Sequence, residues 1–177
     1  MSKSITLRIP IEPKAVQSVD AKIVHGRVFT YQPKDVVKFK ERVRKIAIAA
    51  IPEGFKPFST GIAVRYTHIF KQLESASATD RGLIRSSCVV YKSTRPDFDN
   101  LCKGCSDALT GVLWEDDGLI AKALVEKIYG SVDGIVVTVR ELNWKDKLDA
   151  YLRKLVQNLG FSSEVPVHEE WWDEEQD

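Results

Sequence analysis

Two short stretches of the chain, RPDFDNLCK (residues 95–103) and WEDD (residues 114–117), contain four aspartates and a lysine on either side of an apolar segment. Carboxylates are hard oxygen ligands suited to Mg²⁺, which takes one or two of them together with water and substrate phosphates. A lysine beside such a cluster supplies a positive charge for a phosphate or a transition state. This pattern requires a fold that holds acidic residues close together at the surface.

The spacing around the first stretch indicates how it folds. Asp97 and Asp99 are two residues apart, so on an extended segment both point to one side while Phe98 points into the core. Asp99 then takes the N-cap position of a helix at about residues 100–110, whose buried side is expected to carry Leu101, Cys105, Ala108 and Leu109. Lys103 follows Asp99 by four residues, and Asp107 follows Lys103 by four, which places the three on one helix face.

Asp116 and Asp117 follow a turn at Thr110-Gly111 and open the next expected strand. If this strand begins at the sheet edge where the helix begins, Asp97, Asp99 and Asp117 come together. Taken singly, each aspartate is explained by a cap, a helix pair or a polar turn. Together they disfavour one another's ionisation unless a cation neutralises them, so metal-dependent phosphate chemistry and a structural role both stay open at this point.

Alternation and helical spacing predict the remaining elements. We expect strands at residues 5–11, 22–24, 27–31, 60–70, 88–91, 119–129 and 135–140, and a helix at residues 34–50 with a basic outer face of Lys34, Lys38, Lys40, Arg42, Arg44 and Lys45. Residues 72–87 have no periodicity and are predicted to form a loop or hairpin tip. His68 is expected to be a packed or solvated residue of its strand.

The C-terminal part is predicted to differ from the rest. Asn143 is a plausible N-cap for a helix with a stripe of Trp144, Leu148, Tyr151, Leu155 and Leu159. Residues 164–177 hold seven acidic residues and no lysine or arginine, and are expected to be disordered. The preceding residues therefore have 26 basic and 18 acidic residues, a net charge of +8 that attracts phosphate backbones.

Composition bounds the class of protein. A length of 177 residues with 44% apolar and 29% charged residues predicts one globular domain, without a secretory signal or a membrane span. Three cysteines form no disulfide framework, which predicts reduced thiols in a cytoplasm. Cys102 and Cys105 form a C-x-x-C pair, but a zinc site needs two further ligands, and no histidine or cysteine follows at paired spacing. Buried thiols are the better interpretation.

The order RPDFDNLCK, then DALT (residues 107–110), then WEDD resembles the signature of RusA-type endonucleases, Holliday-junction resolvases of bacteria and their phages. The similarity spans about residues 5–140. It implies a small mixed α/β fold acting as a homodimer in a bacterial cytoplasm. It also implies cleavage of DNA phosphodiesters with Mg²⁺ or Mn²⁺, leaving paired nicks in a four-way junction. In this resemblance the metal ligands and catalytic residues are Asp97, Asp99 and Asp117, with Asp116 as a possible further ligand and Lys103 as the essential cation.

The complete prediction is an α/β (mixed α+β) nuclease domain at residues 1–142, an additional helix at 143–163 and the acidic tail at 164–177. DNA contacts are predicted for Lys14, Arg27, Lys92 and Arg95. Two alternatives remain: a nuclease with broader choice among flaps and forks, and a non-catalytic junction-binding protein. The tail with Trp171 and Trp172 either competes with DNA for the basic surface, docks a protein partner or only solubilises the chain.

Overall fold

The computed structural model describes residues 3–16, 20–24, 27–72, 75–86, 88–142 and 154. The chain divides into two compact units, residues 1–141 and 142–177. The predicted C-terminal helix and acidic tail lie outside the described residues, apart from Lys154. In the part of the chain that is described, no helix is long and apolar enough to cross a membrane.

The first unit is built on a five-stranded mixed sheet. Its strands are β1 (Ser4–Ile9), β4 (Ile62–Lys71), β5 (Val90–Tyr91), β6 (Ile120–Gly130) and β7 (Gly134–Glu141), in the order β1-β7-β4-β6-β5. β4 and β6 are parallel, and all other neighbours are antiparallel. The predicted mixed α/β fold is therefore confirmed for the described residues, which show one protomer.

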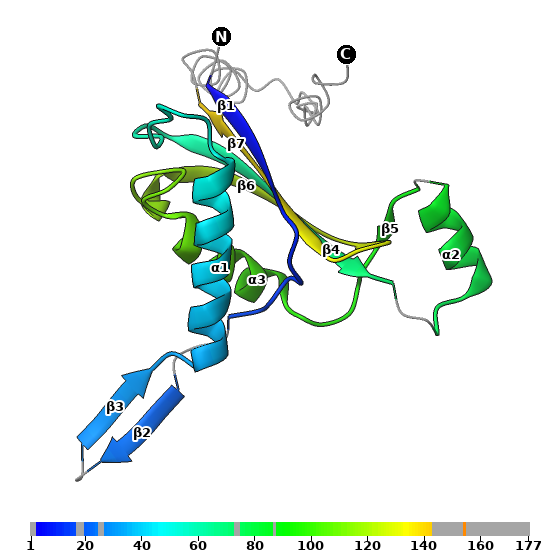
Figure 1. Ribbon diagram of the computed structural model, residues 1–177, viewed down its shortest axis with the longest axis horizontal. Coiled ribbons are helices and arrows are strands. Elements are labelled where there is room, and N and C mark those ends of the chain that lie inside the picture. Colours follow the sequence, from blue (N-terminus) through cyan, green and yellow to red (C-terminus); the bar gives the residue numbers. More distant parts are fainter. Residues whose placement is uncertain are drawn as a thin grey trace. The chain divides into compact units, whose positions relative to one another are not determined.

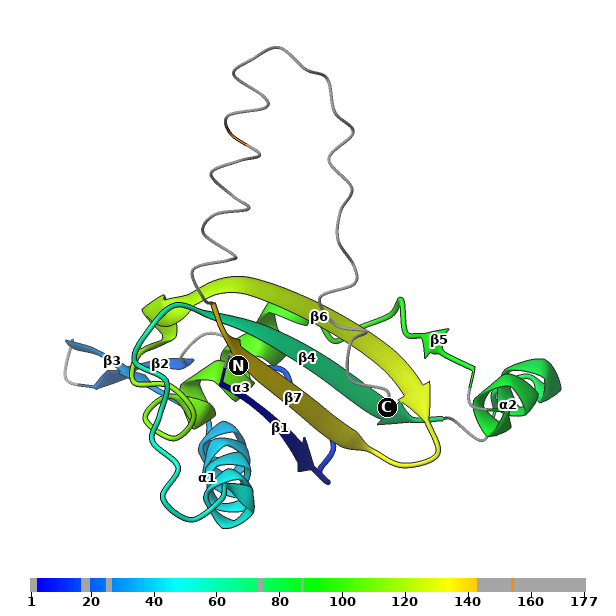
Figure 2. The same cartoon turned by 90° about the horizontal axis from the view of Figure 1, so that it is seen from above.

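Two helices, α1 (Lys34–Ala50) and α3 (Phe98–Leu109), cover one face of this sheet and contact each other (Figure 1, Figure 2). α1 has the predicted bounds. Its buried residues, Val36, Phe39, Val43 and Ala47, follow helical spacing, so one apolar stripe faces the core.

Strand register explains which side chains meet under the helices. Tyr66 of β4 pairs with Val137 of β7 and Val125 of β6. The next residue on the same face, His68, pairs with Ile135 and Lys127. Because paired residues of neighbouring strands point to the same face, these rows form the floor on which α1 and α3 pack. The core also contains Leu7, Ile9, Ile62, Val64 and Val139.

The two short N-terminal strands predicted at residues 22–24 and 27–31 pair as a hairpin. β2 (Asp20–Val24) pairs with β3 (Arg27–Tyr31) in a separate two-stranded sheet, which extends away from the main sheet at the N-terminal end of α1 (Figure 1). Ile23 and Val28 on this hairpin are exposed. β1 ends at Ile9, two residues before the predicted end, because Pro10 has no N–H for the ladder, and β1 forms an edge of the sheet.

The prediction that residues 72–87 form a loop is wrong. Within this stretch lies α2 (Ala78–Arg85), and the hydroxyl of Ser77 caps it by accepting a hydrogen bond from the backbone N–H of Asp80 at 3.0 Å. None of its residues is buried. A short helix without an apolar stripe leaves no periodic signal, although a serine three residues before an acidic residue is a typical helix start.

The cations predicted on the outer face of α1 are exposed, apart from the half-buried Lys40, and two of them contact the end of α3. Lys40 forms an ion pair of 2.6 Å with Asp107 of α3, and Arg44 donates a hydrogen bond of 2.9 Å to the carbonyl oxygen of Thr110. These two cations therefore face the end of α3. Asp107 therefore pairs with Lys40 of α1, and not with Lys103 as a helix pair four residues apart.

Candidate functional site

The RPDFDN motif forms the start of α3, but differently from the prediction. Asp97 is the N-cap, with extended backbone angles of φ −71° and ψ 141°, and the helix begins at Phe98. Asp99 therefore lies in the first turn rather than at the cap. Phe98 is 61% exposed and does not point into the core. The prediction kept Phe98 and Asp99 in an extended segment, whereas both already belong to the helix.

The segment leading into α3 is fixed from the sheet below. Lys127 of β6 donates hydrogen bonds of 2.9 Å to the carbonyl oxygens of Thr94 and Pro96. Both bonds are charge-assisted, and the one to Pro96 is partly buried. They hold the backbone immediately before Asp97. No sequence pattern identifies Lys127, because its position under this segment depends on the pairing of β6 with β4.

Asp97, Asp99 and Lys103 are all exposed, and none of them has an ion-pair or hydrogen-bond partner among the other described side chains. The N-terminus of α3 carries a partial positive charge that favours anions near it. Carboxylates that are exposed and unpaired at such a position are available to an external cation.

The second motif is anchored by its tryptophan. Trp114 is fully buried, and its indole N–H donates to the hydroxyl of Thr110 at 3.1 Å. The backbone on both sides of Trp114 bonds Phe58, with Phe58 N–H to Leu113 O at 2.8 Å and Glu115 N–H to Phe58 O at 3.0 Å. These contacts fix the chain just before the WEDD aspartates.

The two aspartates of this motif have different environments. Asp116 caps the short 3-10 helix η1 (Asp117–Leu119), because its carboxylate accepts a hydrogen bond of 2.7 Å from Gly118 N–H. Asp117 is exposed, and its charge contributes to the raised pKa of Tyr66, which is caused first by burial. Tyr66 in turn shares a hydrogen bond of 2.8 Å with Ser106 of α3. Asp117 therefore lies near the packing of α3 on β4.

The two cysteines of α3 are structural. Cys105 is buried in the core and Cys102 is half-buried, and both are free. Burial raises the pKa of the Cys102 thiol to about 11, with a further contribution from Asp99, and burial also raises the pKa of Cys105. Redox and metal chemistry need thiolates, so the structure supports the interpretation of this pair as buried thiols.

No three His, Cys, Asp or Glu side chains among the described residues are grouped to form a preformed metal cage. Mg²⁺ uses one or two carboxylates and completes its shell with water and substrate phosphate oxygens. The exposed carboxylates of Asp97, Asp99 and Asp117 fit that donor chemistry. That all three bind the same ion stays a prediction.

The comparison with family models decides the classification. Residues 10–140 match the model of the RusA endodeoxyribonuclease. The chain belongs to the RusA endodeoxyribonuclease family. It is also 28% identical over 138 residues to YqaN, an uncharacterized protein of Bacillus subtilis (strain 168), in a match that covers 75% of this chain and 92% of YqaN. The resemblance drawn from the motifs is thus confirmed.

In this RusA-family chain, a basic concavity of about 670 Å³ lies beside the first motif. Five basic side chains line it with two acidic ones: Lys14, Lys38, Arg42, Lys92 and Arg95, with Glu12 and Asp35. Pro96, the residue before Asp97, is also part of the lining. We refer to this surface as the basic concavity.

The basic concavity brings together three of the four predicted DNA contacts, Lys14, Lys92 and Arg95. Arg27 lies on β3 and is not part of the lining. Lys14 forms an ion pair with Asp35, which holds the pKa of that carboxyl below its usual value. Lys38 and Arg42 were expected on a basic helix face but were not assigned as contacts, since the sequence does not show which part of α1 faces the loop before α3.

Proposed function

We propose that this RusA-family protein is a Mg²⁺-dependent endodeoxyribonuclease, with Mn²⁺ as a substitute, that resolves four-way DNA junctions by paired symmetric nicks. The observation that carries the proposal is the position of unpaired, exposed carboxylates at the start of α3, directly beside the basic concavity. A phosphate backbone held by the basic side chains would pass next to Asp97.

In this proposal Asp97, Asp99 and Asp117 hold the metal, and Asp116 supports Asp117 by fixing η1. A metal ion held there would supply a Lewis acid that lowers the pKa of a water nucleophile and offsets charge on the scissile phosphate. Lys103, exposed one turn after Asp99, stabilises the negative charge that develops on the phosphate oxygens. Lys127 keeps Asp97 in position through the carbonyl oxygens of Thr94 and Pro96.

The basic concavity supports the DNA-binding part of the proposal. Lys14, Lys92 and Arg95 lie there with Lys38 and Arg42, so five cations, of which Lys14 is paired with Asp35, line one surface that phosphates can approach. Phosphate contacts supply most of the affinity and position the substrate without reading its sequence. Arg27 on the hairpin would contact a more distant part of the same DNA.

Paired nicks need two sites. We propose a homodimer, because a two-fold axis in the protein matches the two-fold symmetry of a junction. We place the protein in the cytoplasm of a bacterium or of a phage-infected bacterium, where its free cysteines stay reduced.

The test compares substrates of equal length and sequence: a four-way junction, a replication fork, a flap and a linear duplex, each with and without Mg²⁺. We expect symmetric, ligatable nicks in the junction and much slower cleavage of the duplex. Equal cleavage of forks or flaps would establish the broader branched-DNA nuclease instead. Tight junction binding without nicks would establish the non-catalytic binding protein.

A further inference from the structure

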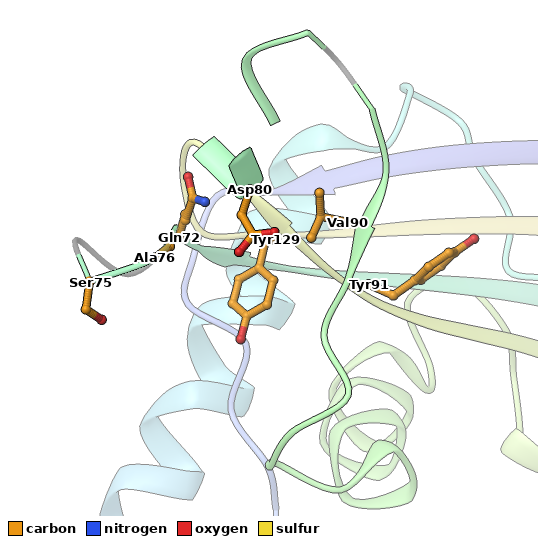
Figure 3. A pocket seen from close by; sticks show the side chains of 7 residues that line it. All are labelled: Gln72, Ser75, Ala76, Asp80, Val90, Tyr91 and Tyr129. Carbon is orange, nitrogen blue, oxygen red and sulfur yellow. The ribbon is translucent and has the colours of Figure 1, made fainter. Parts of the chain in front are cut away.

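A second pocket, of about 310 Å³, lies at the end of the sheet beyond the catalytic motifs (Figure 3). It is formed where β4, the start of α2, β5 and the end of β6 meet. Its lining consists of Gln72, Ser75, Ala76, Asp80, Val90, Tyr91 and Tyr129. This volume is at the lower end of the range for small-molecule sites. None of these residues has a role in the proposed cleavage reaction.

Tyr129 provides the aromatic surface of this pocket. It pairs with Val90 in the register of β5 and β6, so these two side chains share one face, whereas the ring of Tyr91 points away from Tyr129 (Figure 3). The Lys92 ammonium lies 3.4 Å from the Tyr129 hydroxyl and donates to Thr94 at 2.6 Å. The Tyr129 ring is therefore held in place from the side of the basic concavity.

The polar groups of the pocket are matched to a ligand with hydrogen-bonding edges. The side-chain amide nitrogen of Gln72 is buried and has no hydrogen-bond partner among the described residues, although the Gln72 backbone N–H is bonded to Gly130 O at 3.0 Å. A buried donor without a partner is costly, and a ligand that accepts its hydrogen bond removes that cost. The Asp80 carboxylate, next to Tyr129 in Figure 3, adds an acceptor.

The charge of Asp80 decides which part of a nucleic acid fits. A carboxylate repels a phosphate, so this pocket is not an extension of the phosphate-binding surface. Asp and Gln side chains recognise the exocyclic amino groups of cytosine and adenine. An aromatic ring stacks on the face of any base. The combination fits the ring and amino edge of a base.

The pocket is connected to the basic concavity by shared residues. An intermediate hollow is lined by Gln72 and Tyr129, which belong to the pocket, and by Phe70, Lys92 and Glu12, which belong to the basic concavity. The Lys92 ammonium is 5.2 Å from the ring centres of both Phe70 and Tyr129. A strand whose phosphates follow the basic concavity would bring a base to Tyr129.

We propose that this pocket binds one unpaired adenine or cytosine of the branched DNA, stacked on Tyr129, with its amino group donating to the Asp80 carboxylate and a ring nitrogen accepting from the Gln72 amide. The inference rests on the proposed function, because it identifies the structural feature of the substrate that the chain recognises outside the cleavage site. A base in a continuous duplex is stacked on its neighbours and inaccessible to the pocket. At a branch point, stacking is interrupted and a base leaves the duplex at lower cost.

The test measures coupling between Tyr129 and a single base. Junction dissociation constants are determined in EDTA for the wild type and for Tyr129→Ala, with each nucleotide that flanks the branch point replaced in turn by an abasic site. At one position we expect the abasic site to weaken wild-type binding by roughly five- to a hundred-fold. The same abasic site should have little effect on Tyr129→Ala. Tyr129→Phe keeps the ring and should behave as the wild type.

Further variants control for folding and for aromatic loss in general. Tyr31→Ala removes an exposed tyrosine outside the pocket and should keep the full sensitivity to the abasic site. Asp80→Asn should reduce the preference for adenine or cytosine over thymine or guanine at that position. If Tyr129→Ala fails to fold, this variant tests whether the pocket recognises the base. If the wild type cleaves junctions, but each abasic site weakens binding equally in the wild type and in Tyr129→Ala, this inference alone is overturned. A wild type that neither binds nor nicks junctions would overturn the proposed function.

Discussion

At the scale of single residues, His68 shows how burial sets the ionisation of a side chain. It is fully buried on β4, and neither ring nitrogen has a hydrogen-bond partner among the described residues. Burial and, to a lesser extent, the positive charge of Lys127 on the neighbouring strand together lower the pKa of His68 from 6.5 to about 4. The imidazole is therefore neutral at pH 7 and packs as an apolar ring, stacked on Tyr66 at a centroid distance of 6.3 Å. The expectation of a packed histidine is confirmed.

This burial predicts an acid-sensitive stability. Well above pH 6.5 the histidine is neutral in both the folded and the unfolded chain, and it contributes no pH dependence. As the pH falls from 6.5 towards 4, the unfolded chain takes up a proton that the folded chain does not. The free energy of unfolding then decreases by up to roughly 3 kcal/mol. Urea unfolding of the wild type and His68→Leu at pH 7 and pH 4.5 measures this difference. We expect similar stabilities at pH 7 and a smaller acid-induced loss in the variant; equal losses would contradict the account.

At the scale of elements, the contact of α3 with the segment before the hairpin depends on a glycine. Gly104 is buried in the middle of α3, and a Cβ atom there would lie 2.6 Å from Val16 Cγ2 and 3.3 Å from Phe39 Cε1. The Val16 N–H also donates to the carbonyl oxygen of Asn100 at 2.9 Å, which ties this segment to α3. The close approach places Lys14 beside the basic concavity.

We therefore expect Gly104→Ala to destabilise the protein by about 1–3 kcal/mol, because overpacking outweighs the better helix propensity of alanine. Gly82→Ala is the matched control. Gly82 lies in α2, and nothing is within 4 Å of a Cβ atom built there. That substitution should stabilise α2 by up to about 1 kcal/mol. Chemical denaturation measures both, and a stabilised Gly104→Ala variant would show that α3 does not pack as described.

The helices also show which elements can be predicted from local sequence patterns. α1 was predicted to the residue, because an apolar stripe lies between Pro33 and Pro52. α2 was missed, because it buries nothing. The start of α3 was placed two residues too late, because alternation of Asp97, Phe98 and Asp99 resembles a strand.

The candidate site was predictable only in part for the same reason. The motif residues carry local signals, and the family match confirms the resemblance they indicated. The roles of Lys127 and Arg44 depend on strand register and helix packing between distant segments, which no local pattern encodes.

At the scale of the whole molecule, the distribution of charge predicts how DNA binds. Arg42→Ala removes a cation from the basic concavity, whereas Lys45→Ala removes an exposed cation of the same helix that does not line it. We expect Arg42→Ala to weaken junction binding and to reduce the slope of log affinity against log salt by about 1. Lys45→Ala should change both much less. Equal effects would show that only net charge matters.

The acidic tail is expected to change the electrostatic attraction between the protein and DNA. Deleting residues 164–177 removes seven acidic residues. If the tail competes with DNA for the basic surface, the shortened chain binds junctions more tightly at low salt, and the difference fades as salt screens the charges. Fluorescence anisotropy over a salt titration measures this. Unchanged affinity at low salt would leave a protein partner or solubility as the function of the tail.

The most direct test of the account is junction nicking with the metal removed and restored. The wild type should be inactive in EDTA and regain activity with Mg²⁺ or Mn²⁺. Asp97→Asn and Asp117→Asn should lose at least about 100-fold in nicking rate. Their stability without metal should be unchanged or higher, because repulsion between carboxylates is relieved. Nicking in EDTA at the Mg²⁺ rate, or an Asn variant as active as the wild type, would contradict the assignment of these aspartates as metal ligands.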